Sequence, residues 1–187
     1  LGDVYKRQVQ KLTGLLIIAT IPAALVGLFL NDYIEKFSQS GGFLGISFII
    51  TAVLLYFSQK AGKRVKTIES MSYVDAAVIG VTQGIAVMPG ISRSGSTTSA
   101  GLFAGLQKED AMRFAFLMSI PVILGSAVLG VKDIVSEPAA VEWGPVIVGM
   151  LAAGISGYVA IRFMLNFFKK RSLNIFAVYT AVLGILI

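Results

Sequence analysis

The stretch Gln83-Gly-Ile-Ala-Val-Met-Pro-Gly-Ile-Ser-Arg-Ser-Gly-Ser-Thr-Thr98 is where this apolar chain concentrates hydroxyls, glycines and an arginine. An apolar run over residues 74–88 leads into it, and a run of small residues over 95–105 leads away. Pro89-Gly90 between two such runs is typical of a tight turn. The pattern therefore predicts a helix, a turn and a second helix within residues 74–105.

The turn is expected to hold an anion. Arg93 lies at its tip, and the second helix begins just after it, so free N–H groups and the positive end of the helix dipole point to the same place. A guanidinium fork favours phosphate, and Gly95 would let the backbone approach a ligand closely. The alternative is that these small and hydroxylated residues only pack helices together. The hydroxyls around Arg93 belong to Ser92, Ser94, Ser96, Thr97 and Thr98.

The composition places the chain in a membrane. Of its 187 residues, 56% are hydrophobic and 14% charged, which is outside the range of soluble domains. There is no cysteine and no histidine, which excludes disulfides and an imidazole general base within these residues. The net charge of +6 comes from basic residues in short loops beside apolar runs, so we expect a lipid bilayer and no nucleic acid as partner.

Hydropathy predicts an all-α, polytopic membrane protein in a single membrane domain. Basic residues in 59–73 and 169–171 mark cytoplasmic loops, whereas the acidic loop 132–143 is expected outside and 31–42 forms another polar loop. Residues 1–10 are polar and begin with Leu, which indicates a truncated or non-native start. We expect about five spanning helices, at residues 12–30, 43–58, 114–131, 146–168 and 173–187.

This topology makes residues 74–105 a re-entrant hairpin. With one span between the loops 59–73 and 132–143, the hairpin must cross the membrane either twice or not at all. Its arms are about 15 and 11 residues, roughly 22 and 17 Å as helices, and so are shorter than a bilayer core. Gln83 within the first arm needs a polar partner, and either lines the site or packs between helices. Helix capping is expected of Asp75, Glu109 and Asp110.

Residues 89–97, Pro-Gly-Ile-Ser-Arg-Ser-Gly-Ser-Thr, resemble the Pro-Gly-x-Ser-Arg-Ser-Gly-x-Thr motif of the bacterial undecaprenyl-diphosphate phosphatases, also called bacitracin-resistance proteins. The likeness extends to residues 21–27, 73–84 and 113–125. It implies a fold with two inverted re-entrant hairpins in the bacterial inner membrane. It also implies hydrolysis of undecaprenyl diphosphate, which recycles the lipid carrier for peptidoglycan and cell-wall synthesis and gives bacitracin resistance.

The resemblance also implies roles for single residues. Arg93, Ser92 and Ser94 are expected to be catalytic, and Ser96 stands at a variable position of the motif. The expected substrate-binding residues are Gly90, Gly95, Thr97, Thr98 and Gln83. A homodimer is one option for the assembly.

The family's first motif, Glu-x-x-x-Glu followed by Pro-x-Ser-Ser-x-Gly-His, is absent here. The chain therefore resembles the C-terminal two-thirds of the family and is expected to be inactive alone. A divalent metal, Mg or Ca, is expected as cofactor, with its ligands outside this chain. An anion or lipid-phosphate transporter remains the alternative, because transporters also aim broken helices at anions.

Overall fold

The computed structural model describes residues 2–30, 33–34, 37, 40–136, 142–170 and 172–187, and the elements in these ranges are helices joined by short connections. One isolated backbone bridge pairs Lys66 with Leu106. The helices are α1 (Gly2–Phe29), α3 (Gly41–Lys60), the 3-10 turn η1 (Ile68–Ser70), α4 (Tyr73–Ile85), α5 (Arg93–Phe103), α6 (Lys108–Ser136), α7 (Trp143–Lys170) and α8 (Asn174–Leu186).

Four helices are long and apolar enough to cross a membrane: Tyr5–Phe29, Gly41–Lys60, Lys108–Val131 and Trp143–Phe168. A fifth apolar helix, α8, is shorter at 13 residues. The chain is thus an all-α, polytopic membrane protein, as the hydropathy predicted.

Most helix boundaries differ from the prediction by a few residues, and two helix starts differ by more. The first helix begins at Gly2 rather than at residue 12, because nothing in the polar residues 2–11 breaks a helix. Helix α6 begins at Lys108 rather than at residue 114. The acids Glu109 and Asp110, for which helix capping was predicted, occupy the first turn of α6, where the helix dipole favours negative charge.

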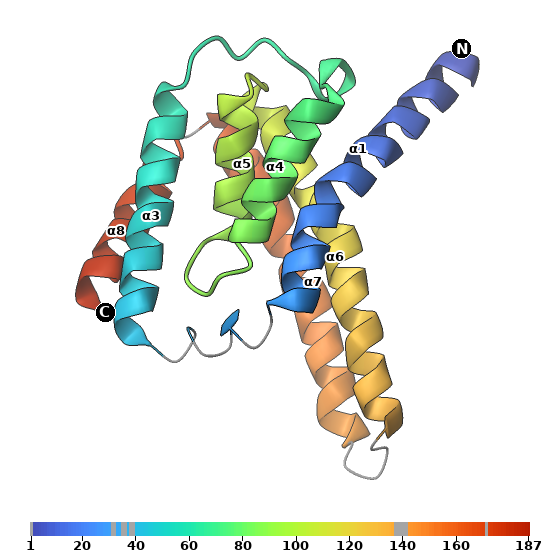
Figure 1. Cartoon of the computed structure of the whole chain (residues 1–187), viewed down its shortest axis with the longest axis vertical. Coiled ribbons are helices and arrows are strands. Elements are labelled where there is room, and N and C mark those ends of the chain that lie inside the picture. Colours follow the sequence, from blue (N-terminus) through green and yellow to red (C-terminus); the bar gives the residue numbers. More distant parts are fainter. Residues whose placement is uncertain (1, 31–32, 35–36, 38–39, 137–141, 171) are drawn as a thin grey trace.

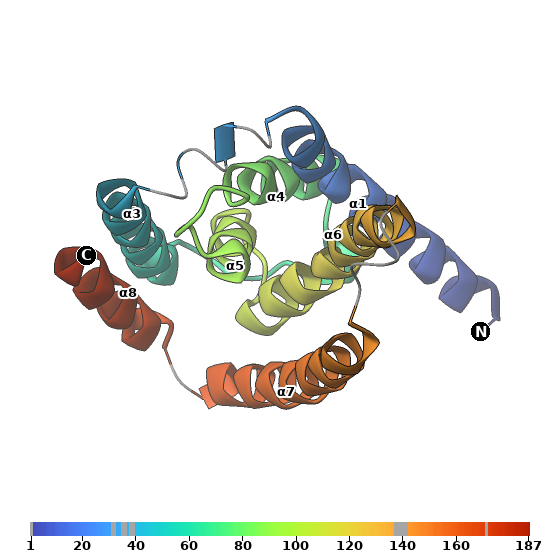
Figure 2. The same cartoon turned by 90° about the horizontal axis from the view of Figure 1, so that it is seen from below.

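The hairpin of α4 and α5 stands at the centre of the molecule, with α3 and α8 on one flank and α1, α6 and α7 on the other (Figures 1 and 2). The turn between α4 and α5 ends part-way along the flanking helices (Figure 1). Both open ends of the hairpin lie at the end of the molecule that carries the connection after α3, whereas α6 ends and α7 begins at the opposite end. Parts of the predicted loops are helical instead, since residues 41–42, 132–136 and 143 belong to α3, α6 and α7. Residues 31–32, 35–36, 38–39, 137–141 and 171 lie outside the described residues.

The first arm of the hairpin packs against α1 by means of two glycines. A Cβ added at Gly80 would lie 2.5 Å from the carbonyl oxygen of Ala19, and one added at Gly84 would lie 3.2 Å from that of Pro22. Both would meet backbone, which cannot move aside as a flexible side chain can. The glycines therefore allow α4 and α1 to approach more closely than side chains would permit.

Backbone hydrogen bonds join the two open ends of the hairpin. The Lys66 N–H donates to Gly105 O over 3.0 Å, and the Gln107 N–H donates to Lys66 O over 2.8 Å. The Lys66 ammonium also lies 3.0 Å from Asp75. The chain entering α4 and the chain leaving α5 are therefore held side by side, which is the geometry of a hairpin that returns to its starting face.

Asp75 caps α4, as predicted. The Ser72 hydroxyl accepts from the Asp75 N–H, and the Asp75 carboxylate accepts from the Ser72 N–H. Burial by itself would raise the pKa of Asp75, but the hydrogen bonds from Ser72 and Lys66 together hold this pKa below its ordinary value. The carboxylate is therefore charged and engaged at neutral pH.

Candidate functional site

The turn at the hairpin tip needs a glycine at position 90. Gly90 has a φ of +83°, in the left-handed region. A Cβ there would also lie 2.8 Å from the Ser47 Cβ and 3.1 Å from the Leu44 carbonyl oxygen. Gly90, predicted to bind substrate, thus lies against α3, where its immediate role is to let the turn pack closely on that helix.

Ser92 is the N-cap of α5. Its hydroxyl accepts from the Gly95 N–H over 3.2 Å, and its carbonyl accepts from the Ser96 N–H over 2.8 Å. A Cβ at Gly95 would lie 2.9 Å from the Ser92 hydroxyl oxygen, so Gly95 leaves room for this cap. Two N–H groups of the first turn, those of Arg93 and Ser94, donate to no acceptor among the described residues.

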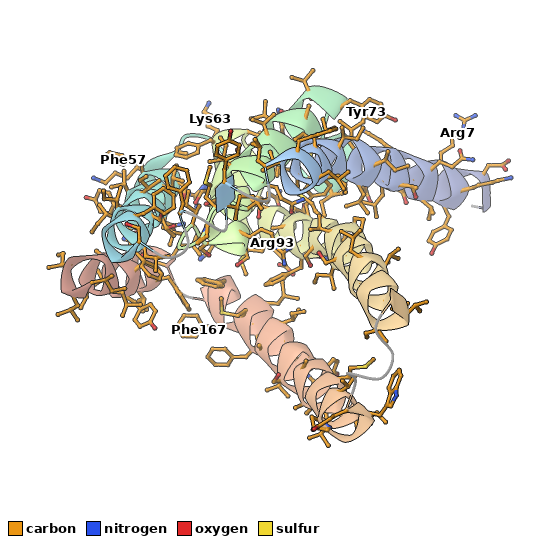
Figure 3. All side chains as sticks on the ribbon, turned by 60° about the horizontal axis from the view of Figure 1, so that its bottom comes forward. Arg7, Phe57, Lys63, Tyr73, Arg93 and Phe167 are labelled. Carbon is orange, nitrogen blue, oxygen red and sulfur yellow. The ribbon has the colours of Figure 1, made fainter. Side chains whose placement is uncertain are left out.

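Arg93 lies in the middle of the molecule, far from Arg7 on the projecting part of α1 (Figure 3). Its side chain is half-buried, and within the described part of the chain its guanidinium makes no hydrogen bond or ion pair. The neighbouring Ser94 is exposed. A half-buried cation without a protein counter-ion, beside two free N–H groups at a helix N-terminus, forms a site that favours an anion.

Helix α3 positions the tip, a role that the motif itself does not reveal. The Ser92 N–H donates to the buried Thr51 hydroxyl over 3.1 Å, and the Ser99 hydroxyl donates to the buried Ser58 hydroxyl over 3.2 Å. Ser47, Thr51 and Ser58 are spaced by four and seven residues, which places all three on one helix face. That spacing is the sequence signal by which they could have been found.

The other motif residues divide between the interior and a small hollow. Thr97 is 1% exposed and donates to the Arg93 carbonyl over 2.8 Å, so its hydroxyl serves the helix backbone. Thr98 is almost buried but lines the hollow. Gln83 is 0% exposed, and neither its amide oxygen nor its amide nitrogen has a partner; the Ser96 hydroxyl is likewise buried without one.

The hollow, of about 70 Å³, joins the motif to an apolar wall. Ser92, Ser94, Gly95 and Thr98 supply its polar end, and Thr180 adds one further hydroxyl. Phe168 and Phe176, whose ring centroids are 5.0 Å apart, belong to the apolar part. The other apolar residues are Leu55, Met112, Phe116, Met164 and Leu173.

The site does not include a recognisable set of metal ligands. Among the described residues, no three acidic, histidine or cysteine side chains come together. The residues near Arg93 offer hydroxyls and N–H groups, of which the N–H groups cannot coordinate a cation. The described residues therefore offer no cluster of acidic, histidine or cysteine side chains for the expected Mg or Ca ion, whose ligands were predicted to lie outside this chain.

Comparison with known proteins identifies the family. The family described as "Bacitracin resistance protein BacA" matches residues 2–186. This chain belongs to that family. A protein of Carboxydothermus hydrogenoformans named undecaprenyl-diphosphatase is 42% identical, over 98% of this chain and 72% of its own length. A protein of Alkaliphilus metalliredigens with the same name is also 42% identical, over 98% of this chain and 67% of its own length.

A third relative bears on the expectation that the chain is an inactive portion of a longer enzyme. The undecaprenyl-diphosphatase of Methanothermobacter thermautotrophicus is 41% identical over 92% of this BacA-family chain and 97% of its own length. Together with the family match over residues 2–186, this leaves that expectation without support. It rested on one missing acidic and histidine motif, and a missing motif does not show that the remaining residues lack activity.

Proposed function

We propose that this protein is a membrane phosphatase that hydrolyses undecaprenyl diphosphate to undecaprenyl phosphate and phosphate, and so recycles the lipid carrier of cell-wall synthesis. Family membership and the names of three relatives support the reaction. We further propose that it resides in the bacterial inner membrane and contributes to bacitracin resistance. Its α4–α5 hairpin, residues 74–105, would enter the membrane from the cytoplasmic face and return to it.

The single observation that carries the proposal is the position of the motif at one end of an apolar hollow. The free N–H groups of Arg93 and Ser94 and the Arg93 guanidinium suit a diphosphate, which carries more than one negative charge. The aromatic and aliphatic wall beyond the motif suits apolar contact with the start of a polyprenyl chain. A ligand with an anionic head and an apolar tail meets both requirements.

The residues of the motif then have distinct tasks. Arg93 neutralises charge on the diphosphate, and its fixed fork holds two phosphate oxygens at once. Ser94 and the Arg93 and Ser94 N–H groups donate to the same oxygens and stabilise the charge that develops as the phosphoanhydride bond breaks. Ser92 caps α5 and so orients these donors. Thr98 borders the hollow, and Gln83 supplies a buried amide for which a bound substrate or water would be the partner.

The decisive experiment replaces the guanidinium. Arg93→Lys keeps the charge but loses the fork, and Arg93→Ala loses both, so each should lower turnover by about a hundredfold or more. Phosphate release from undecaprenyl diphosphate should be measured on purified protein in detergent, at matched amounts of monodisperse sample. Ser96→Ala is the matched control in the same motif, since its hydroxyl has no partner to lose.

Two outcomes would contradict the proposal. Near wild-type phosphate release by Arg93→Lys would show that Arg93 does not act as a bidentate clamp. Movement of undecaprenyl diphosphate across the membrane of proteoliposomes, without any release of phosphate, would instead identify a transporter.

A further inference from the structure

Another hollow, of about 410 Å³, lies between α6 and α7; its lining is basic and shares no residue with the hollow beside the motif. Arg113 and Glu109 line it from the first turns of α6, and Arg162, Leu165 and Asn166 line it from the last turns of α7. The two guanidiniums thus come from different helices, both long and apolar enough to cross a membrane.

The hollow lies near one membrane surface. Arg113 is five residues from the start of α6 at Lys108, and Arg162 is eight residues from the end of α7 at Lys170, which places them about 8 and 12 Å along the helix axes. These two helix ends are neighbours, because the Lys108 ammonium lies 5.7 Å from the centroid of the Phe168 ring. They also lie at the end of the molecule where α3 ends (Figure 1). Counted from these helix ends, the two arginines lie near the boundary between the headgroups and the hydrocarbon core on the basic side.

Neither arginine has a protein counter-ion among the described residues. Arg162 is exposed, and its Nη1 donates to the Tyr158 hydroxyl over 3.3 Å, one turn nearer the middle of α7. This contact draws the guanidinium away from the helix end, so it does not extend to bulk water as arginines near membrane surfaces usually do. Arg113 is exposed as well, and its side chain makes no hydrogen bond or ion pair within the described ranges.

An exposed guanidinium on a membrane helix is costly unless an anion or water meets it. Here two guanidiniums and the amide of Asn166 face one hollow that contains a single carboxylate, Glu109. Two arginines and one glutamate give the lining a net charge of +1, and each guanidinium offers five N–H donors. Basic hollows between membrane helices are a common way to hold an anionic lipid headgroup.

We propose that this hollow binds the phosphate of an anionic membrane phospholipid, with Arg113 and Arg162 on the phosphate oxygens and Asn166 donating beside them. The occupant comes from the bilayer, because the lining belongs to two spanning helices whose outer surfaces are apolar. Leu165 and the exposed Phe163 offer contacts to the acyl chains. The site is separate from the motif around Arg93, and its lipid is a resident of the membrane, not the substrate.

Native mass spectrometry of the purified full chain tests this proposal. The protein is taken from nanodiscs of phosphatidylcholine that contain a minor share of phosphatidylglycerol, and retained lipids are counted. Phosphatidylglycerol should be retained in preference to phosphatidylcholine. The double variant Arg113→Gln/Arg162→Gln should retain about tenfold less of it, since charge-assisted bonds are lost. Lys6→Gln/Arg7→Gln, on the projecting part of α1, removes the same charge elsewhere and should retain the wild-type amount.

A variant with the opposite expected effect distinguishes loss of the lipid site from misfolding. Glu109→Gln removes the one carboxylate of the hollow and should increase phosphatidylglycerol retention by about threefold, which a damaged protein would not do. Equal retention by wild type and the Arg113→Gln/Arg162→Gln variant overturns the proposal, as does loss of retention in Arg93→Gln, which would assign the lipid to the phosphatase motif. Displacement of the lipid by millimolar inorganic phosphate would show that the hollow takes free phosphate instead.

Discussion

Thr51→Val tests whether α3 positions the phosphatase motif. The Thr51 hydroxyl is fully buried, donates to the Ser47 carbonyl over 3.1 Å and accepts from the Ser92 N–H over 3.1 Å. Valine has nearly the same shape, so the substitution removes the hydroxyl without opening a cavity. The Ser47 carbonyl still belongs to the backbone ladder of α3, whereas the Ser92 N–H is left without its acceptor.

The expected loss of stability follows from this one N–H group without an acceptor. An unmade hydrogen bond to a partly buried N–H costs about 1–3 kcal/mol, so Thr51→Val should lower the free energy of unfolding by this amount. Ser92 caps the helix whose first N–H groups face the substrate, so turnover should also fall by about tenfold through misplacement of those donors. Thr51→Ser keeps the hydroxyl, so its free energy of unfolding should fall by only about 1 kcal/mol, for the loss of one methyl group.

Unfolding in mixed micelles and phosphate release in detergent measure the two effects. Thr20→Val on α1 is the control, because its hydroxyl donates to the Leu16 carbonyl of its own helix and not to a residue of the tip. If Thr51→Val matches the Thr20→Val variant in both stability and turnover, the contact between α3 and the motif has no positioning role.

Three further predictions concern the hairpin. Gly80→Ala places a Cβ 2.5 Å from a backbone oxygen of α1 and should destabilise the protein by about 1–3 kcal/mol in micelle unfolding, whereas Gly27→Ala, with open space around it, should not. The pKa of Asp75 is lowered in the folded protein, so its stabilising contribution is present at neutral pH and is lost as the pH falls below about 4. Asp75→Asn should therefore be less stable than wild type in thermal unfolding at pH 7, and the difference should shrink as the pH is lowered from 4 towards 2. Cysteines placed at Lys63 and Lys108 should react with an impermeant maleimide from the same side of the membrane, and labelling from opposite sides would show that one hairpin arm crosses.

Several features of the fold follow from local patterns and were predicted correctly. Long apolar runs predict helices of spanning length because a lipid core leaves the backbone no other hydrogen-bond partners. The helix–turn–helix around Pro89-Gly90 and the capping role of Asp75 depend on residues within a few positions of one another. Helix ends were less accurate, since polar residues beyond an apolar run, such as those of 2–11, continue a helix without changing its hydropathy.

By itself, the sequence determined that this is an all-α membrane protein with a polar motif on a short hairpin, because composition, periodicity and turn residues act locally. Which residues meet the motif was decided only by the tertiary structure. Thr51 reaches Ser92 across 41 positions, and the hollow beside the motif draws its walls from α3, α5, α6, α7 and α8. Such contacts depend on how helices cross, and helix crossing depends on the combined packing of many side chains, as with Gly80 against Ala19. No single stretch of sequence carries that information.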